Sequence, residues 1–174
     1  MSNGRPPSFT SRVPAGDNRA RAVCDHCGFV DYVNPRVVVG VVCTWEERLL
    51  LCRRAIEPRK GFWTIPAGFL EQGETPEEGA VREAAEEAGA EVGIDALLGV
   101  YSVPRISQVQ MMFRGHVRSP NVAAGEESLE VRLAAWDDVP WNDLAFPSVV
   151  AALRHFDEVR GLLTFPSFRL TLGG

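Results

Sequence analysis

The segment from Thr75 to Gly89 constrains the fold more than any other part of the sequence, because it carries both the start and the stop signals of a helix. Thr75 is a good N-cap, and Pro76 fits the first helical position. Glu78, three residues after the cap, completes a capping box. Gly89 is a natural C-terminal stop. The sequence therefore predicts a helix over this segment.

The two faces of this helix differ in chemistry. Glu83, Glu86 and Glu87 lie at positions i, i+3 and i+4 and share one face. The opposite face is small and apolar, made of Val81, Ala84, Ala85 and Ala88. Like charges at this spacing cost a few tenths of a kcal/mol per pair, so the acidic face does not serve helix stability. Clustered carboxylates suit Mg²⁺ or Mn²⁺, although a solvated acidic face is the alternative on these three residues alone.

Hydrophobic patterns and turn residues predict the other elements. The sequence RVVVGVVCT at residues 36–44 is a dense β-branched run typical of a buried strand. We expect further strands at residues 49–52, 97–104, 109–117 and 129–136, and a last helix at about 147–159. Strands and helices are interspersed without strict alternation. The sequence therefore predicts a single α/β domain.

Composition excludes several classes of protein. The chain has 174 residues, of which 45% are hydrophobic, and a net charge of −5. This charge argues against nucleic acid as a partner bound by charge alone, and no apolar run approaches the roughly 18–20 residues of a membrane span. Four cysteines are too few for a disulfide scaffold, and the start does not resemble a secretory signal. We therefore expect a cytoplasmic protein that does not span a membrane.

The ends of the chain lack strong patterns. We interpret residues 1–34 as a leader, poorly ordered over 1–21, that ends in half of a zinc-binding knuckle. We interpret residues 161–174 as a C-terminal tail. The half knuckle is the C-x-x-C of Cys24 and Cys27, whereas a closed structural zinc site needs four ligands. Bound structural zinc is therefore doubtful; the alternatives are a metal-free turn or zinc shared between two chains.

The sequence from Gly68 reads GFLEQGETPEEGAVREAAEEAGA and fits the spacing G-x5-E-x7-R-E-U-x-E-E-x-G-U, where U is aliphatic. The fixed positions are Gly68, Glu74, Arg82, Glu83, Glu86, Glu87 and Gly89. This spacing resembles the Nudix box, with Ala84 and Ala90 smaller than the usual aliphatic residues. The wider resemblance, to Nudix hydrolases with an N-terminal zinc ribbon, runs from about Gly16 to Phe156.

The resemblance implies an α/β/α sandwich with a mixed β-sheet, the Nudix domain covering residues 35–160. It also implies hydrolysis of a nucleoside diphosphate linked to another group, assisted by Mg²⁺ or Mn²⁺. Glu83 and Glu87 would ligate the metals, with Glu86 as a further ligand and the Ala67 carbonyl as another. Many relatives form homodimers, and we expect one here.

The resemblance assigns supporting roles to other residues of the box. Arg82 would orient Glu83 through an ion pair, Glu74 would stand near the helix start, and Gly68 begins the box. A later loop supplies the general base in many relatives. Glu127 is our first candidate and Glu130 the second, against an ordinary acidic loop or Glu83 itself as the base.

Substrate choice is predicted from the residues around the box. The P-A-G sequence before it resembles ADP-ribose pyrophosphatases, and the S-Q-P-W-P-F-P array of NADH pyrophosphatases is absent. The stretch LLLCRRAIEPRKGFWTIPAGFLEQGET resembles bacterial and plastid relatives that act on ADP-ribose and FAD. We therefore rank ADP-ribose and FAD first. NADH, nucleoside triphosphates, capped RNA and a non-catalytic ligand sensor remain alternatives. The candidate substrate-binding residues are Arg53, Arg54, Arg59, Trp63, Arg105 and Gln108; Trp63 is alternatively a core residue.

Overall fold

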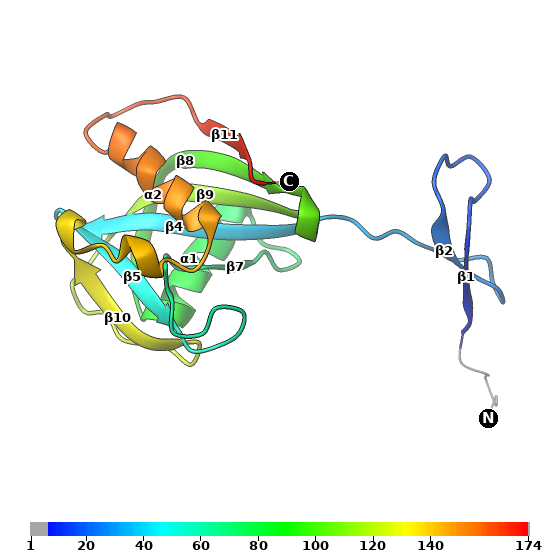
Figure 1. The fold of residues 1–174 in the computed structure, drawn as a ribbon, viewed down its shortest axis with the longest axis horizontal. Coiled ribbons are helices and arrows are strands. Elements are labelled where there is room, and N and C mark those ends of the chain that lie inside the picture. The colour runs from blue at the N-terminus through cyan, green and yellow to red at the C-terminus, as the bar shows by residue number, and fades with distance from the viewer. Residues whose placement is uncertain (1–6, 174) are drawn as a thin grey trace. The chain divides into compact units, whose positions relative to one another are not determined.

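A mixed β-sheet runs through residues 36–173 of the computed structural model, which describes residues 7–173 (Figure 1). Its strands are β4 (Arg36–Trp45), β5 (Arg48–Arg54), β6 (Trp63–Thr64), β7 (Ala67–Phe69), β8 (Val92–Val103), β9 (Gln108–Val117), β10 (Ser128–Ala134) and β11 (Phe168–Thr171). The strand order is β10-β5-β4-β9-β8-β11, with β6 paired to β5 and β7 paired to β4. Because β4 pairs in parallel with β9 and antiparallel with β5, the sheet is mixed.

Helices cover both faces of this sheet, as Figure 1 shows. Helix α1 (Pro76–Ala88) packs its alanines against Val39 and Val41 of β4 in one core cluster. Helix α2 (Pro147–Val159) packs against Val42 in a second cluster. Successive residues of a strand point to opposite faces, so one strand supplies both clusters. The expected α/β/α sandwich is confirmed.

The sheet divides at β4, and this division shapes the candidate site. Thr44 and Trp45 pair with β5, whereas Val38–Gly40 pair with β7. Strands β5 and β7 therefore lie along the same edge of β4 but pair with different segments of it, and the two strands separate from each other. Helix α1 follows β7 after a short loop, which brings its acidic face to the place where the strands separate.

Local sequence signals located both helices. The Thr75 side chain accepts from the Glu78 amide and the Glu78 side chain accepts from the Thr75 amide, so the capping box is confirmed. Gly89 ends α1 in the left-handed conformation. Helix α2 has the expected bounds, whereas β8 begins at Val92, earlier than expected. The 3-10 helices are η1 (Pro104–Ile106), η2 (Trp136–Asp138) and η3 (Trp141–Asp143).

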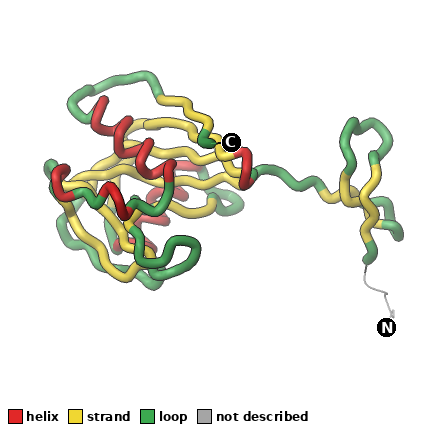
Figure 2. Tube along the Cα trace, in the orientation of Figure 1, coloured by secondary structure: helices red, strands yellow, loops and turns green. Residues whose placement is uncertain are grey.

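The interpretation of residues 161–174 as a tail is wrong for residues 168–171. A loop after α2 returns the chain to the sheet (Figure 2), where β11 pairs in parallel with β8. The His155 ring stacks on Phe168 with centroids 4.0 Å apart, and Tyr101 Oη lies 2.8 Å from His155 Nδ1. These contacts join residues far apart in sequence, so no local pattern predicts the strand.

Within the described residues, 7–35 form a separate compact unit. It holds an antiparallel sheet of β1 (Phe9–Arg12), β2 (Arg21–Cys24) and β3 (Val30–Asp31). The expectation of a poorly ordered leader is therefore wrong for β1, and residues 1–6 lie outside the described residues. Backbone pairing and polar contacts organise this unit, which is why hydrophobic periodicity missed it. The Asp17 carboxylate, for example, accepts from Arg21 Nε and two backbone amides.

None of the helices within residues 7–173 has the length and apolar character needed to cross a membrane.

Candidate metal centre

The Glu83 carboxylate lies directly against the backbone of Gly68 in β7. A Cβ atom at position 68 would overlap the Glu83 carboxylate, so glycine is required for this close approach. Glu83 is only 9% exposed, and burial raises its pKa, opposed by a hydrogen bond from Arg82. Helix α1 and β7 thereby hold a carboxylate in a fixed place at the division of the sheet.

Glu87, one turn further along α1, is more deeply buried at 5% exposure. The Ala67 amide donates to Glu87 Oε2 at 3.2 Å. Burial nevertheless raises the pKa of Glu87 to about 8, and the nearby Arg54 guanidinium offsets this only in part. A buried carboxylate with so little compensation is stabilised when a cation binds beside it.

Arg82 organises the acidic residues around it. Its side chain contacts Glu74 Oε1 at 2.6 Å, Glu83 Oε1 at 2.8 Å and Glu86 Oε2 at 3.0 Å, and it donates to the Phe69 carbonyl at 2.9 Å. The expected ion pair between Arg82 and Glu83 is therefore present. Arg82 joins the loop after β7 to α1 and fixes the position of Glu83.

The residues of this centre fit a hard divalent cation. Glu83 Oε2 and Glu87 Oε1 receive no hydrogen bond from any residue in the described part of the chain, so both can serve as ligands. The carboxylates do not point to one common position in this structure. Within residues 7–173, no three acidic, histidine or cysteine side chains are grouped closely enough to enclose a cation. Arg82 draws Glu86 aside, and the like charges of the glutamates repel one another. Ala67 contacts Glu87 through its backbone amide. The role of the Ala67 carbonyl as a metal ligand therefore stays a prediction.

The loop before β10 lies beside the two buried glutamates. The Gly125 amide donates to the Glu87 carbonyl, which ties this loop to the last turn of α1. Glu127 follows, exposed, and its charge contributes to the raised pKa of both Glu83 and Glu87. Glu130 instead faces Arg53 across the strand pair, with Nη1 to Oε2 at 3.7 Å. The geometry therefore favours Glu127 over Glu130 as the group near the metal ligands.

The three candidate arginines lie in different surroundings. Arg53 Nε donates to the Gly61 carbonyl at 2.9 Å, and Arg53 also faces Glu130. Arg59 lies over the Phe62 ring. Arg54 is the one whose charge reaches Glu87. It also lies over the ring of Phe146, a residue that the sequence analysis missed because it is 92 positions further along the chain.

Trp63 is a core residue rather than a free stacking surface. It is 8% exposed, belongs to the cluster under α2, and has the Arg132 guanidinium 4.1 Å from its ring centroid. Its ring is covered, so the structure favours the core alternative. Arg105 is exposed in η1, and Gln108 accepts a hydrogen bond from Gln110 at the start of β9.

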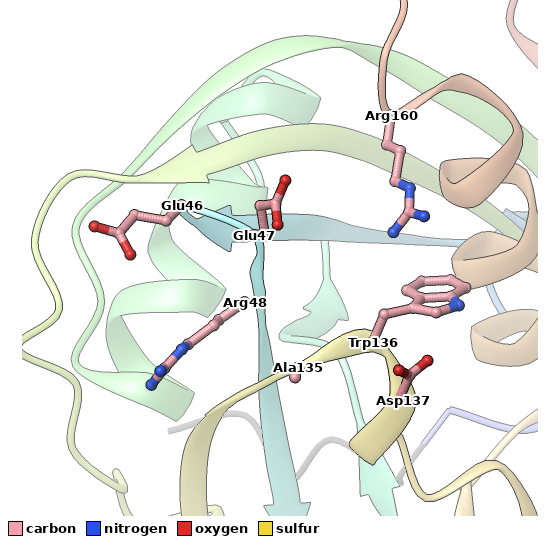
Figure 3. A pocket seen from close by; sticks show the side chains of 7 residues that line it. All are labelled: Glu46, Glu47, Arg48, Ala135, Trp136, Asp137 and Arg160. Atoms are coloured by element: carbon pink, nitrogen blue, oxygen red, sulfur yellow. The ribbon is translucent and has the colours of Figure 1, made fainter.

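A surface hollow of about 400 Å³ lies elsewhere on the same unit (Figure 3). It is lined by the β4–β5 turn at residues 46–48, by Trp136 and Asp137, and by Arg160 after α2. Strand β5 runs from Arg48 at this hollow to Arg54 near Glu87, a span of about 20 Å. The hollow shares no residue with the carboxylate cluster and is separate from the candidate metal centre.

Two family models match the chain. A model described as the NUDIX domain matches residues 34–156, and a zinc-ribbon model described as Nudix N-terminal matches residues 7–33. Among solved structures, the chain resembles a NUDIX hydrolase from Nitrosomonas europaea with 43% identity and a TM-score of 0.89, over 94% of this chain and 93% of that one.

Curated relatives match over a shorter span. An ADP-ribose pyrophosphatase of Methanocaldococcus jannaschii is 34% identical over 63% of this chain and 67% of its own length. An NAD-capped RNA hydrolase of Pseudomonas aeruginosa is 30% identical over 81% of this chain and 48% of its own length. The chain thus spans about two thirds of the first relative and about half of the second.

The residues of the N-terminal unit do not fit the zinc that its family model implies. Between residues 7 and 33 the only cysteines are Cys24 and Cys27, and a closed site needs four ligands. Asp17 is engaged by Arg21, and Asp25 accepts a hydrogen bond from Thr10. His26 lies between the two cysteines and is poorly placed to close the same site, so these residues do not complete a set of four ligands and no role of zinc is derived for this unit.

Proposed function

Because the chain belongs to the Nudix hydrolase family, we propose that it is a divalent-cation-dependent pyrophosphatase whose substrates are ADP-ribose, FAD or both, with AMP as a product. The observation that carries this proposal is the pair of buried carboxylates, Glu83 and Glu87, held against Gly68 and Ala67. Mg²⁺ or Mn²⁺ bound there would neutralise the diphosphate and lower the pKa of the attacking water.

The residues of α1 and β7 hold the cations in this proposal. Glu83 and Glu87 supply the carboxylate ligands, Glu86 a further one, and Ala67 its carbonyl. Glu86 must turn from Arg82 to do so, and its exposed side chain leaves it free to move. Arg82 remains paired with Glu74 and acts through Glu83, whose carboxylate it orients.

Glu127 is the general base of the proposal. It is exposed, lies beside Glu83 and Glu87, and sits on a loop fixed to α1 by the Gly125 amide. From there it would take the proton of the attacking water as the new oxygen–phosphorus bond forms and the bond from that phosphorus to the bridging oxygen breaks; the bridging oxygen leaves with the second phosphate, so that AMP and a second phosphomonoester are released. Glu130 is the second candidate and Glu83 the third; Glu130 is disfavoured by its contact with Arg53.

The choice of ADP-ribose rests on the P-A-G sequence and on the relative named ADP-ribose pyrophosphatase. FAD is added because the stretch at residues 49–75 resembles relatives that act on ADP-ribose and FAD. The relative named NAD-capped RNA hydrolase supports a second candidate, cleavage of NADH or of capped RNA. Nucleoside triphosphates are a further alternative. A non-catalytic sensor is less well supported, because every charged position of the box is retained. We also propose that the protein is cytoplasmic and that it forms a homodimer. Sedimentation analysis of the purified protein tests the homodimer.

A substrate panel with Mg²⁺ tests the proposal. ADP-ribose, FAD, NADH, CoA and dGTP are incubated with the full chain, and the products are separated by chromatography. Release of AMP from ADP-ribose or FAD at the highest kcat/KM supports the first choice. A preference for NADH supports the second candidate. If folded protein hydrolyses none of these compounds, the proposed function is wrong.

A further inference from the structure

We propose that Phe146, at the start of α2, is a positioning residue that holds the Arg54 guanidinium in place to bind the diphosphate oxygens. This inference rests on the proposed function, because it takes the ligand to be a diphosphate. It assigns to the Arg54–Phe146 pair the recognition of the group that all the candidate substrates share. Neither residue would then distinguish ADP-ribose from FAD.

The backbone of Arg54 is fixed on both sides. Its amide donates to the Phe62 carbonyl and its carbonyl accepts from the Gly61 amide, both at 2.9 Å. Across the other edge, Arg54 is in register with Ser128 of β10. Arg54 therefore begins its side chain from a rigid point between the loop that carries Glu127 and the loop at residues 55–62.

The side chain of Arg54 is held without using its terminal nitrogens. Nε donates to the Pro58 carbonyl at 2.9 Å. Neither Nη atom donates to an acceptor in the described part of the chain, whereas both Nη atoms of Arg82 are engaged. The Arg54 guanidinium thus presents two free donor nitrogens with four N–H groups, the arrangement that suits phosphate oxygens.

The Arg54 guanidinium lies over the ring of Phe146, with Cζ 5.2 Å from the ring centroid. This cation–π contact restrains the guanidinium, while neither Nη atom donates a hydrogen bond to an acceptor within residues 7–173. The Phe146 backbone is itself fixed, because its carbonyl accepts from the Val149 and Val150 amides at the start of α2. The Ala145 amide before it donates to the Trp63 carbonyl.

The location of the pair fits a diphosphate held at the metal centre. The Ala55 amide, next to Arg54, donates to the Glu127 carbonyl at 2.8 Å, and the Gly125 amide of the same loop donates to the Glu87 carbonyl, so Arg54 lies beside the loop that adjoins the metal centre. In agreement with this, the charge of Arg54 lowers the pKa of Glu87. The other two candidate arginines are less suitable. Arg53 is drawn to Glu130. Arg59 also lies over an aromatic ring, but its exposed side chain makes no hydrogen bond within residues 7–173 that would fix the guanidinium as the Pro58 carbonyl fixes Arg54. Among the three, Arg54 combines a fixed position, free donors and proximity to Glu87.

The test measures binding of imidodiphosphate, whose P–N–P linkage resists hydrolysis, in the presence of Mg²⁺ by calorimetry. We expect Phe146→Leu, which keeps apolar bulk but has no ring, to weaken binding about two- to five-fold, the scale of one cation–π contact. Phe146→Tyr should restore wild-type affinity. Arg54→Gln should weaken binding about 10- to 100-fold. In the Arg54→Gln background, Phe146→Leu should have no further effect, because Phe146 acts through Arg54.

A matched control comes from the segment that follows α2. Phe165 lies 4.6 Å from Arg114 Cζ in a pair of the same kind, and Phe165→Leu should leave imidodiphosphate affinity unchanged. The inference is overturned if Phe146→Leu binds like wild type, if its effect persists without Arg54, or if wild type does not bind imidodiphosphate. The proposed function fails separately, when wild type releases no AMP from ADP-ribose or FAD.

Discussion

The carboxylate of Glu83 occupies the space beside the α-carbon of Gly68 that any side chain at position 68 would fill. The glycine that begins the box therefore has a steric purpose. Its backbone does not have a positive φ, so alanine would be acceptable to the chain itself. What alanine would disturb is the position of a metal ligand.

We predict that Gly68→Ala reduces kcat for ADP-ribose about 100-fold, since a displacement of roughly 1 Å at a reacting centre has an effect of this size. Steady-state kinetics with saturating Mg²⁺ measure it. Gly161→Ala is the matched control, because nothing lies within 4 Å of a Cβ at that position. Equal activity of Gly68→Ala and wild type would show that Glu83 does not need its present position.

Arg82 should not be replaceable by lysine. Lysine keeps the charge but cannot bridge Glu74, Glu83, Glu86 and the Phe69 carbonyl together, as the planar guanidinium does. We expect Arg82→Lys to lower kcat about 10- to 100-fold, the range for loss of a residue that supports a metal ligand. Arg160→Lys, at the surface ion pair with Asp157, is the control and should retain full kcat. A fully active Arg82→Lys would contradict the positioning role.

Glu87 makes cation-free stability depend on pH. Burial raises its pKa from 4.5 to about 8 in the folded protein. Between these values the folded state holds a proton that the unfolded state releases, so the free energy of unfolding falls as pH rises. From pH 6 to pH 8 the loss should be about 2 kcal/mol greater for wild type than for Glu87→Gln. Urea unfolding in EDTA measures the free energy of unfolding of both proteins at each pH. Parallel pH profiles of wild type and Glu87→Gln would show that Glu87 is ionised when the protein folds.

The N-terminal unit should fold without zinc. Protein purified without added zinc should contain much less than one equivalent by mass spectrometry of the metals, because Cys24 and Cys27 supply only half of a closed site. Ser replacement of the exposed Cys27 should leave the melting temperature unchanged. One tightly held zinc per chain would overturn this expectation, and one zinc per two chains would indicate a shared site.

Local signals determined how much of the fold could be predicted. The Thr75 capping box and the Gly89 stop depend on residues a few positions apart, and both lie where the sequence places them. The spacing of the box likewise brings Arg82 to Glu74 and Glu83, because one helix and the loop before it carry all three.

Contacts between distant segments could not be predicted in this way. Strand β11 depends on β8 and on the stacking of His155 with Phe168. Phe146 reaches Arg54 only after the sheet and α2 have packed together. The pattern around Trp63 was compatible with both exposure and burial, and Arg132, from a strand 69 positions later, covers its ring. Each depends on tertiary packing that one sequence does not encode locally.

The most direct test of the central claim is the rate of AMP release from ADP-ribose by Glu87→Gln and by wild type at saturating Mg²⁺. Glutamine keeps the shape of Glu87 and can still accept from the Ala67 amide, but it removes the charge that binds a cation. We predict a loss in kcat of several orders of magnitude, as when an essential catalytic group is removed, with an unchanged circular dichroism spectrum. Undiminished AMP release by folded Glu87→Gln would contradict the account.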